Sequence, residues 1–402
     1  MVFLDVVYNH FGPEGNPLGR LAPDEFFHPE RSTPWGIAIA YERPPVRRFF
    51  IDNAVYWLDE FRFDGLRFDA ADHIRDDDSE EEILVAMARE IRARFPERHI
   101  HLATEDNRNI VGLHPYEAGR PLLHTAEWND DLHNVAHVVA TGESEGYYID
   151  FVEGRWAKLA RALAEGFAYQ GEPSPLAGGE PRGEASAGQP PLAFIDFIQN
   201  HDQIGNRAFG ERLTALAPEP MVRALTAILL LSPHVPLLFM GQEWGEKRPF
   251  VFFCDFEGAL ADSIREGRLT EFSHFAAFSD EAARAEILDP NDPAAFEASK
   301  LDWAERDGAD GRAWLDFTAA LLAVRHREIV PHLAGARRGG RVIASEAGVI
   351  AVDWPLGGAT LRLRANLTDT AATVPPAAGR VIWGEAALPL AAYGVLVTLE
   401  AE

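Results

Sequence analysis

The stretch FIQNHDQIGN, residues 197–206, follows the short apolar run PLAFI, residues 191–195, with only Asp196 between them. An apolar run of this kind is typical of a buried strand. A few residues further on come an amide, an imidazole and a carboxylate in a row, at Asn200, His201 and Asp202. Polar groups directly after a buried strand are typical of a place where the strand reaches a functional surface. The stretch therefore predicts that these side chains lie at the rim of a buried sheet.

Polar residues follow three earlier predicted strands in the same way. Short apolar strands alternate with helical stretches along the chain, which implies a parallel sheet. In a (β/α)8 barrel, the carboxyl ends of all strands share one rim, where the active site lies. We therefore expect the polar residues to meet there. The strands and residues concerned are 3–8 with His10, 65–68 with Arg67 and Asp69, and 100–104 with Glu105.

The sequence predicts two domains. Residues 1–335 have the alternating pattern of a TIM barrel, and 402 residues are enough for a barrel and a second domain. Within residues 336–402 the pattern changes to short strands with glycine turns, at Gly339-Gly340 and Gly357-Gly358. This change predicts a small all-β C-terminal domain of a β-sandwich-like kind.

Charge and cysteine content restrict the partners. The formal net charge is -26, whereas nucleic acid and anionic membranes require a basic face, so we expect neither as a partner. Cys254 is the only cysteine, so no intrachain disulfide can form, which fits a cytoplasmic location. The longest apolar region, residues 221–240, is interrupted by Arg223 and two prolines. It therefore predicts a buried helix and strand rather than a membrane span.

Three strand-end carboxylates are candidates for acid–base chemistry, at Asp69, Glu105 and Asp202. Glycosidases need two carboxyl groups beside the scissile bond: one attacks or activates water, and the other holds a proton for the leaving oxygen. Arg67 lies two residues before Asp69 and hence on the same strand face, where a guanidinium would keep Asp69 ionised. Asp106 follows Glu105 directly and points to the opposite face, so only one of the two can be the acid.

Four segments that carry these residues resemble the four ordered motifs of the α-amylase superfamily. Each segment is short, but together they occur in the family's order, and each stands at the end of a predicted strand. Further stretches are similar to those of the malto-oligosyltrehalose trehalohydrolase family within that superfamily. The four segments that resemble the superfamily motifs are DVVYNH (5–10), GLRFD (65–69), Glu105 and NHD (200–202). The further stretches that resemble the trehalohydrolase family include WNDD (128–131), TGE (141–143), GYYIDF (146–151) and MGQEWGE (240–246).

The resemblance implies a retaining hydrolysis of an α-glucan. Asp69 would be the nucleophile, Glu105 the general acid and base, and Asp202 the residue that stabilises the oxocarbenium-like transition state. The bond cleaved would be the α-1,4 link next to the terminal trehalose of maltooligosyltrehalose, which releases trehalose. No cofactor and no metal ion is implied. The residues expected to contact substrate are His10, Arg67, Trp128, Asn129, Asp130 and His201.

The resemblance also carries an expectation about the barrel itself. The first motif of the superfamily belongs to the third barrel strand, and here it begins at Phe3. We therefore expect a barrel that is incomplete at its N-terminus, with the first two strands absent and the edge of the strand at 3–8 exposed. Two alternatives to trehalose release stay open: a glucan branching or debranching enzyme of the same superfamily, and an inactive glucan-binding fragment. The sequence defines no oligomeric state.

Overall fold

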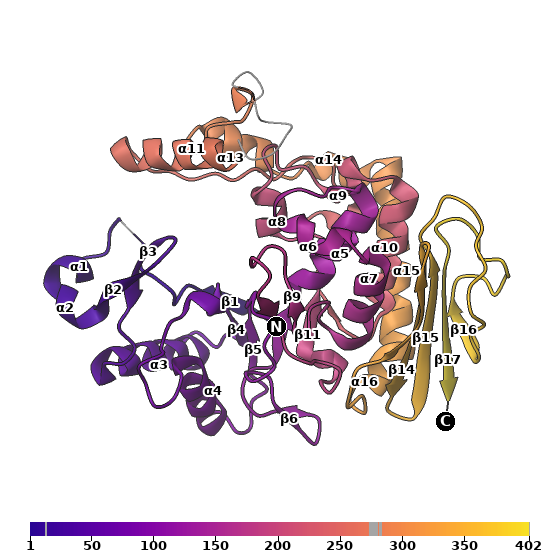
Figure 1. Ribbon diagram of the computed structural model, residues 1–402, viewed down its shortest axis with the longest axis horizontal. Helices are drawn as coiled ribbons and strands as arrows, with labels where there is room; N and C mark the ends of the chain where they lie inside the picture. The colour runs from indigo at the N-terminus through magenta and orange to yellow at the C-terminus, as the bar shows by residue number, and fades with distance from the viewer. Residues whose placement is uncertain (13, 273–279, 281–283, 402) are drawn as a thin grey trace.

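The computed structural model describes residues 1–12, 14–272, 280 and 284–401. At its centre is a six-stranded sheet with the strand order β1-β4-β5-β8-β11-β12. Every neighbouring pair in this sheet is parallel, and the sheet stands in the middle of the molecule in Figure 1. Its strands are β1 (Phe3–Val6), β4 (Gly65–Phe68), β5 (His101–Thr104), β8 (Ala126–Trp128), β11 (Phe194–Asp196) and β12 (Val235–Pro236).

The helices bury the sheet in two apolar cores. The core beside β1, β4 and β5 is completed by α3 (Pro44–Asp59) and α4 (Ile83–Arg94), which lie below the sheet in Figure 1. Strand β4 is buried at all four residues, as expected when a parallel sheet is covered on both faces. The second core is larger and includes residues of α5 (Asp130–Thr141), α7 (Arg155–Glu165), α10 (Glu219–Leu231) and α15 (Ala309–Val324).

One strand does not start where the sequence predicts it. The apolar stretch at 122–126 suggests a strand, yet β8 starts only at Ala126. Residues 122–125 belong to no strand, and an antiparallel hairpin of β6 (Tyr116–Glu117) and β7 (Arg120–Pro121) precedes them. Its two turn residues, Ala118 and Gly119, both have positive φ. An alanine rarely takes the first position of such a turn, which is why sequence reasoning missed the hairpin.

The C-terminal part is an antiparallel sheet with the order β13-β14-β15-β17-β16. The fold prediction, an incomplete parallel barrel followed by a small all-β domain, is therefore confirmed. The predicted boundary between residues 335 and 336 stays a prediction, and Glu402 lies outside the described residues. The strands are β13 (Arg341–Glu346), β14 (Val349–Leu356), β15 (Ala359–Asn366), β16 (Arg380–Trp383) and β17 (Val395–Ala401).

Smaller elements surround the central sheet. The hairpin of β2 (Phe27–Thr33) and β3 (Gly36–Ile39) lies with two short helices at the left of Figure 1. None of the helices in the described part of the chain is both long and apolar enough to span a membrane. Within the described residues, the other α-helices are α1 (Leu18–Leu21), α2 (Pro23–Phe26), α6 (Ile149–Val152), α8 (His201–Gly205), α9 (Leu213–Leu216), α11 (Gly258–Phe272), α13 (Pro293–Ser299), α14 (Trp303–Asp307) and α16 (Val330–Leu333).

Candidate active site

Arg67 joins the carboxylates of three neighbouring strands. It is the third residue of β4 and is only 4% exposed. Its Nη1 donates to Asp5 Oδ1 at 2.8 Å and to Asp69 Oδ1 at 2.7 Å. Its Nη2 lies 2.6 Å from Glu105 Oε2. Because β1, β4 and β5 are adjacent and parallel, one buried guanidinium can hold an acid from each of them.

Glu105 is an acid in a desolvated position directly after β5. Its Oε2 accepts a hydrogen bond from the backbone N–H of Ala70 at 2.9 Å. Burial raises the pKa of Glu105 to about 8; Arg67 acts to lower that pKa, and the charges of Asp130 and Asp69 act to raise it. A carboxyl group with this pKa holds its proton at neutral pH. The surroundings of Glu105 therefore suit proton donation to a leaving oxygen.

Asp202 is held at the start of a short helix that follows β11. It is the second residue of α8, and Asn200 caps that helix by accepting a hydrogen bond from Gln203 N at 2.7 Å. Asp202 is exposed to solvent, and its Oδ1 accepts a hydrogen bond from Asn206 Nδ2 at 2.8 Å. The cap thus fixes the backbone of the NHD segment while the carboxylate stays accessible.

Asp130 connects Asp202 with Glu105 electrostatically. Burial and, after it, the charge of Asp202 raise the pKa of Asp130 to about 7. The charge of Asp130 in turn contributes to the raised pKa of Glu105. Gln203 Nε2 donates to Asp130 Oδ1 at 2.9 Å and ties α8 to the start of α5. The structure thus brings Asp69, Glu105 and Asp202 into one group, linked through Arg67 and Asp130.

The aromatic rings of Trp128 and His201 lie in contact with each other beside the acids. The Arg67 guanidinium lies 4.3 Å from the centroid of the Trp128 ring, which is the geometry of a cation–π contact. The rings of Trp128 and His201 meet edge to face at 6.1 Å. Both predicted substrate-contacting residues therefore belong to the same group as the acids.

His10 and Asn9 connect Asp69 with Trp35, a residue that the sequence analysis does not identify. His10 Nδ1 contacts Asn9 Oδ1 at 2.5 Å, and Asn9 Nδ2 donates to Asp69 Oδ2 at 3.2 Å. The His10 ring stacks on Trp35 at 5.8 Å, and Trp35 meets His73 edge to face at 5.1 Å. Trp35 is 50% exposed, so part of its ring is free to contact a ligand. It lies in the turn between β2 and β3, where no periodicity points to it.

Asn129 has a structural role, and its side chain is not accessible at the surface of the site. It is 0% exposed, and its Oδ1 accepts a hydrogen bond from Leu132 N at 3.2 Å as the N-cap of α5. Its Nδ2 donates to Gly166 O and to Asp196 Oδ1, both at 2.8 Å. Both ends of the Asn129 side-chain amide are therefore engaged in hydrogen bonds within the protein. This arrangement does not support the expected contact of Asn129 with substrate.

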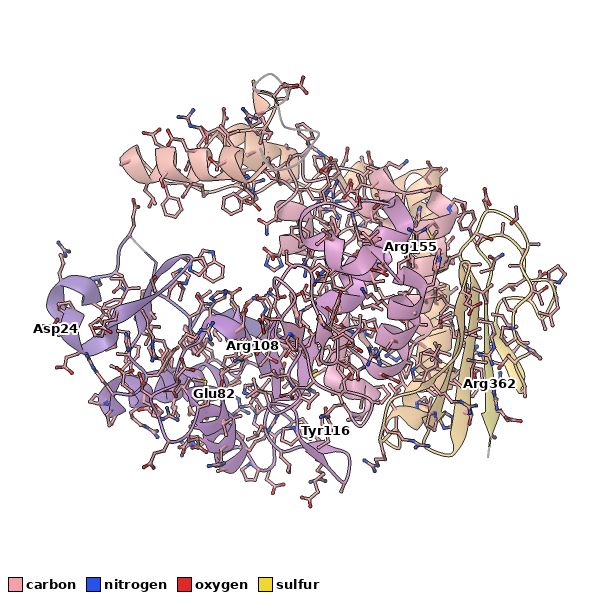
Figure 2. All side chains as sticks on the ribbon, in the orientation of Figure 1. Asp24, Glu82, Arg108, Tyr116, Arg155 and Arg362 are labelled. Atoms are coloured by element: carbon pink, nitrogen blue, oxygen red, sulfur yellow. The ribbon has the colours of Figure 1, made fainter. Side chains whose placement is uncertain are left out.

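The carboxylate of Asp106 pairs with Arg108 rather than with Arg67. Asp106 is 2% exposed, and Arg108 Nε donates to its Oδ1 at 2.9 Å. Arg108 lies near the middle of the molecule in Figure 2. Among the described residues, no group of three or more His, Cys, Asp or Glu side chains is placed to hold a metal ion.

Comparison with known proteins identifies relatives over most of the chain. The chain is 41% identical to a malto-oligosyltrehalose trehalohydrolase of Deinococcus radiodurans, over 82% of this chain and 53% of the relative. It is 36% identical to that of Arthrobacter ramosus, over 81% and 56%. A crystal structure assigned as an alpha amylase from Salmonella typhimurium matches with a TM-score of 0.94 and 51% identity, over 99% of this chain and 68% of that one. Residues 337–401 match a family model described as a domain of unknown function, DUF3459.

A parallel barrel sheet with acids gathered at its strand ends, together with these relatives, defines a protein of the α-amylase superfamily of glycoside hydrolases. The chain spans about half the length of the curated relatives it matches. Within the superfamily, the chain belongs to the malto-oligosyltrehalose trehalohydrolase family.

Proposed function

We propose that the protein is a retaining glycoside hydrolase that cleaves the α-1,4 bond next to the terminal trehalose of maltooligosyltrehalose. The observation that carries the proposal is the arrangement at Arg67, whose guanidinium contacts both Asp69 and Glu105 at the ends of adjacent strands. Two carboxyl groups held side by side, one of them with a raised pKa, are what glycoside hydrolysis needs.

In the first step, an Asp69 oxygen attacks the anomeric carbon, and Glu105 donates its proton to the departing glycosidic oxygen. The trehalose leaves, and a glycosyl ester on Asp69 remains. In the second step, Glu105 accepts a proton from a water molecule that attacks the same carbon, and Asp69 is released. Asp202 would accept hydrogen bonds from sugar hydroxyls and stabilise the positive charge that develops on the ring.

The substrate is proposed from family membership and from the aromatic and polar side chains around the acids. His10, His201, Trp128 and Asp130 surround the acids and provide hydrogen-bonding and stacking groups for a neutral sugar. Relatives that match most of this chain are named for release of trehalose from maltooligosyltrehalose. We propose a cytoplasmic location for the same activity.

Incubation of the protein with maltooligosyltrehalose, and separately with maltoheptaose, tests the proposal. We expect trehalose to be released from the first substrate only, and the variant Glu105→Gln to release none. A change in the branching pattern of a glucan, without trehalose, would instead favour a branching or debranching enzyme. Binding of both substrates without turnover would favour a noncatalytic glucan-binding role.

A further inference from the structure

Glu127 of β8 is a buried acid that the proposed catalytic steps do not use. It is 1% exposed. The register of β5 with β8 ends at the pair formed by Thr104 and Glu127. Directly beyond this pair, the chain of β5 continues through Glu105 to Asp106. Glu127 therefore stands opposite the point at which β5 leaves the sheet and presents the proposed general acid.

The carboxyl of Glu127 serves as the acceptor for the main chain at this point. Its Oε1 accepts a hydrogen bond from Asp106 N at 2.6 Å. That N–H belongs to the peptide bond between Glu105 and Asp106, so it shares a rigid plane with the carbonyl group of Glu105. The Glu127 side chain thus restrains the main chain of Glu105 from the side of β8.

From the opposite side, Glu105 is restrained by the end of β4 and the residues after it. Glu105 N donates to Phe68 O at 3.1 Å, and Ala71 N donates to Glu105 O at 2.7 Å. The Glu105 side chain accepts a hydrogen bond from Ala70 N at 2.9 Å. Without the bond to Glu127, these contacts would hold the acid from one side only, and its carboxyl would shift.

Glu127 itself belongs to an uncharged network. Its Oε2 lies 2.6 Å from Thr104 Oγ1, which in turn lies 2.8 Å from His114 Nε2. Burial and, after it, the charge of Asp106 raise the pKa of Glu127 well above its ordinary value. Burial lowers the pKa of His114 to about 4. At neutral pH both groups are therefore uncharged, and Glu127 offers the Asp106 N–H a neutral carbonyl acceptor.

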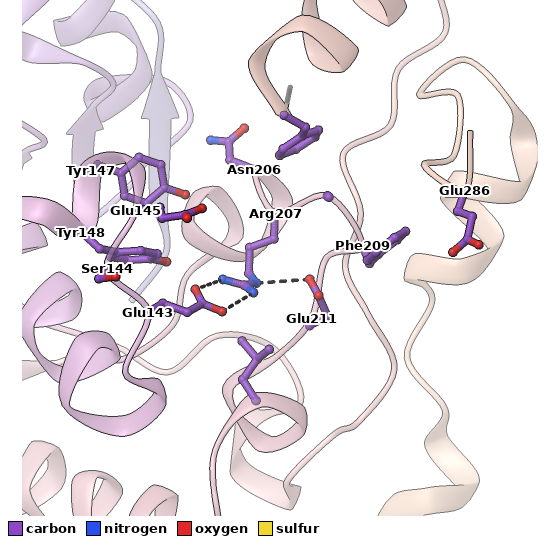
Figure 3. A pocket seen from close by; sticks show the side chains of 13 residues that line it. Glu143, Ser144, Glu145, Tyr147, Tyr148, Asn206, Arg207, Phe209, Glu211 and Glu286 are labelled. Carbon is purple, nitrogen blue, oxygen red and sulfur yellow. Dashed lines mark hydrogen bonds and ion pairs between the residues drawn. The ribbon is translucent and has the colours of Figure 1, made fainter. Parts of the chain in front are cut away.

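Another acid that the proposed steps do not use has a different environment. Glu143 lines a cavity and accepts hydrogen bonds from both Nη atoms of Arg207, as Figure 3 shows. Burial acts to raise the pKa of Glu143, but its hydrogen bonds with His137 and Arg207 lower the pKa to about 2. Glu143 is thus an ionised member of an ion pair, whereas Glu127 is neutral and contacts the main chain beside a proposed catalytic acid.

We propose that Glu127 is a positioning residue for the reaction, which fixes the Glu105 carboxyl at the leaving oxygen by holding the peptide group between Glu105 and Asp106. The inference rests on the proposed function, in which Glu105 is the general acid. A displacement of about 1 Å can cost about 100-fold in rate. Substrate affinity should change little, because His10 and His201 stand on other elements.

Initial rates with two substrates test this role in Glu127→Leu and Glu127→Gln. Maltooligosyltrehalose needs a proton on its leaving oxygen, whereas α-maltotriosyl fluoride expels a fluoride ion, which departs without a proton from Glu105. In Glu127→Leu we expect kcat/KM for maltooligosyltrehalose to fall about 10- to 100-fold, with KM within about twofold of the wild type. For the fluoride, kcat/KM should fall less than about threefold. Glu127→Gln keeps the acceptor oxygen and should stay within about threefold for both substrates.

Asp150→Leu is the matched control, because Asp150 is also 1% exposed. Its carboxylate likewise accepts from a hydroxyl and from a backbone N–H: Ser174 Oγ donates at 2.6 Å and Leu176 N at 2.8 Å. Neither bond involves a neighbour of the proposed catalytic acids. The control should lower the stability of the protein but leave the ratio of the two kcat/KM values unchanged.

An equal fall in kcat/KM for both substrates in Glu127→Leu, or no fall for either, would overturn the positioning role. A loss in Glu127→Gln as large as that in Glu127→Leu would also overturn it. If Glu127→Leu no longer unfolds cooperatively, Thr104→Val replaces it, because it removes the hydroxyl that lies 2.6 Å from Glu127 Oε2. The same selective loss for maltooligosyltrehalose is then expected.

The outcome is separable from that of the proposed function. If the wild type cleaves maltoheptaose instead of releasing trehalose, the same ratio is measured with maltoheptaose and the fluoride. If the wild type turns over no glucan, the proposed function fails, and crystal structures of the wild type and Glu127→Leu decide. Loss of the 2.9 Å contact between Ala70 N and Glu105 Oε2 in the variant would support positioning by Glu127, and an unchanged contact would refute it.

Discussion

Glu105 owes its raised pKa to burial and, to a smaller extent, to the charges of Asp130 and Asp69, and this makes its role testable by pH. A general acid must be protonated in the free enzyme, and burial raises the pKa of Glu105 to about 8. We therefore expect kcat/KM for maltooligosyltrehalose to fall about tenfold per pH unit above that value. Initial rates measured between pH 5 and 10 provide the test. Activity that stays constant up to pH 10 would show that Glu105 is not the acid.

The same carboxyl should also affect stability. In the unfolded chain its pKa returns to 4.5, against about 8 in the folded protein. Between these values the folded form keeps a proton that the unfolded form releases, so the wild type loses stability as the pH rises. Glu105→Gln cannot ionise and avoids this loss. We expect the Tm of Glu105→Gln minus that of the wild type to increase from pH 5 to 8 in calorimetry. A constant difference would contradict the raised pKa.

We expect the exposed ring of Trp35 to contact the substrate without supporting the core. It stacks on His10 and is half exposed, so Trp35→Ala should leave the Tm nearly unchanged. Loss of aromatic packing is worth about 0.5–1.5 kcal/mol, and we expect KM to rise about 3- to 10-fold. The matched control is Ile37→Ala in the same hairpin, where the side chain is 55% exposed. An unchanged KM in Trp35→Ala would place the ring outside the binding cleft.

The positions of the acids could be predicted from sequence, but several of their neighbours could not. Asp69 and Glu105 each stand directly after a strand, and strand order then brings them together. Trp35 sits in a turn without periodicity, so no pattern could locate it. Asn129 stands in a polar run at a strand end, as site residues do, yet its amide is used as a helix cap and within the core. Side-chain direction at such positions depends on long-range partners that a sequence does not show.

At the level of elements, the spacing of β4 and β5 depends on Gly65. A Cβ built on Gly65 would lie 2.5 Å from His101 O in the neighbouring strand. Gly65→Ala must therefore push the two strands apart and with them Asp69 and Glu105. Strain of this kind typically costs about 1–3 kcal/mol. We expect a lower free energy of unfolding and a larger relative loss of kcat than of substrate affinity, because the binding residues on other strands stay in place.

Gly112→Ala is the matched control for Gly65→Ala, because a Cβ on Gly112 meets nothing within 4 Å. Urea denaturation and initial rates, measured for both variants, provide the comparison. Equal stability of Gly65→Ala and Gly112→Ala would mean that the strands tolerate a side chain at this position. The requirement for glycine there arises from the partner strand, and the sequence of β4 alone does not show it.

At the scale of the whole molecule, the two predicted domains share one apolar core. Residues of α7, α10 and α15 pack with residues of β14, β15 and β17 in a single cluster. The chain between the two parts is held against the barrel, since Gly339 N donates to Ala187 O at 3.0 Å and Gly340 N to Ala164 O at 2.5 Å. Alternation of strands and turns predicts the C-terminal sheet, but not which helices cover it.

Trp354 of β14 lies at the centre of this shared core. It is 0% exposed, and its Nε1 donates to Leu163 O of α7 at 3.0 Å. Truncating a buried tryptophan typically costs about 3–5 kcal/mol, so Trp354→Ala should lower the free energy of unfolding by that amount. Because the core is continuous, the loss should shift one common transition, measured in urea by far- and near-ultraviolet circular dichroism.

Two further variants test the origin of this loss of stability: one separates the hydrogen bond of Trp354 from its packing, and the other is a control at an exposed tryptophan. Trp354→Phe keeps most of the packing but loses the hydrogen bond to Leu163, so its loss of stability should be smaller than that of Trp354→Ala. Trp303→Ala removes a tryptophan that is 58% exposed and should change the free energy of unfolding by less than about 0.5 kcal/mol. If Trp354→Ala unfolded in two separate transitions, with the barrel part unaffected, the two domains would be energetically independent. A single transition at lower urea would show that the β-domain stabilises the barrel on which the proposed active site stands.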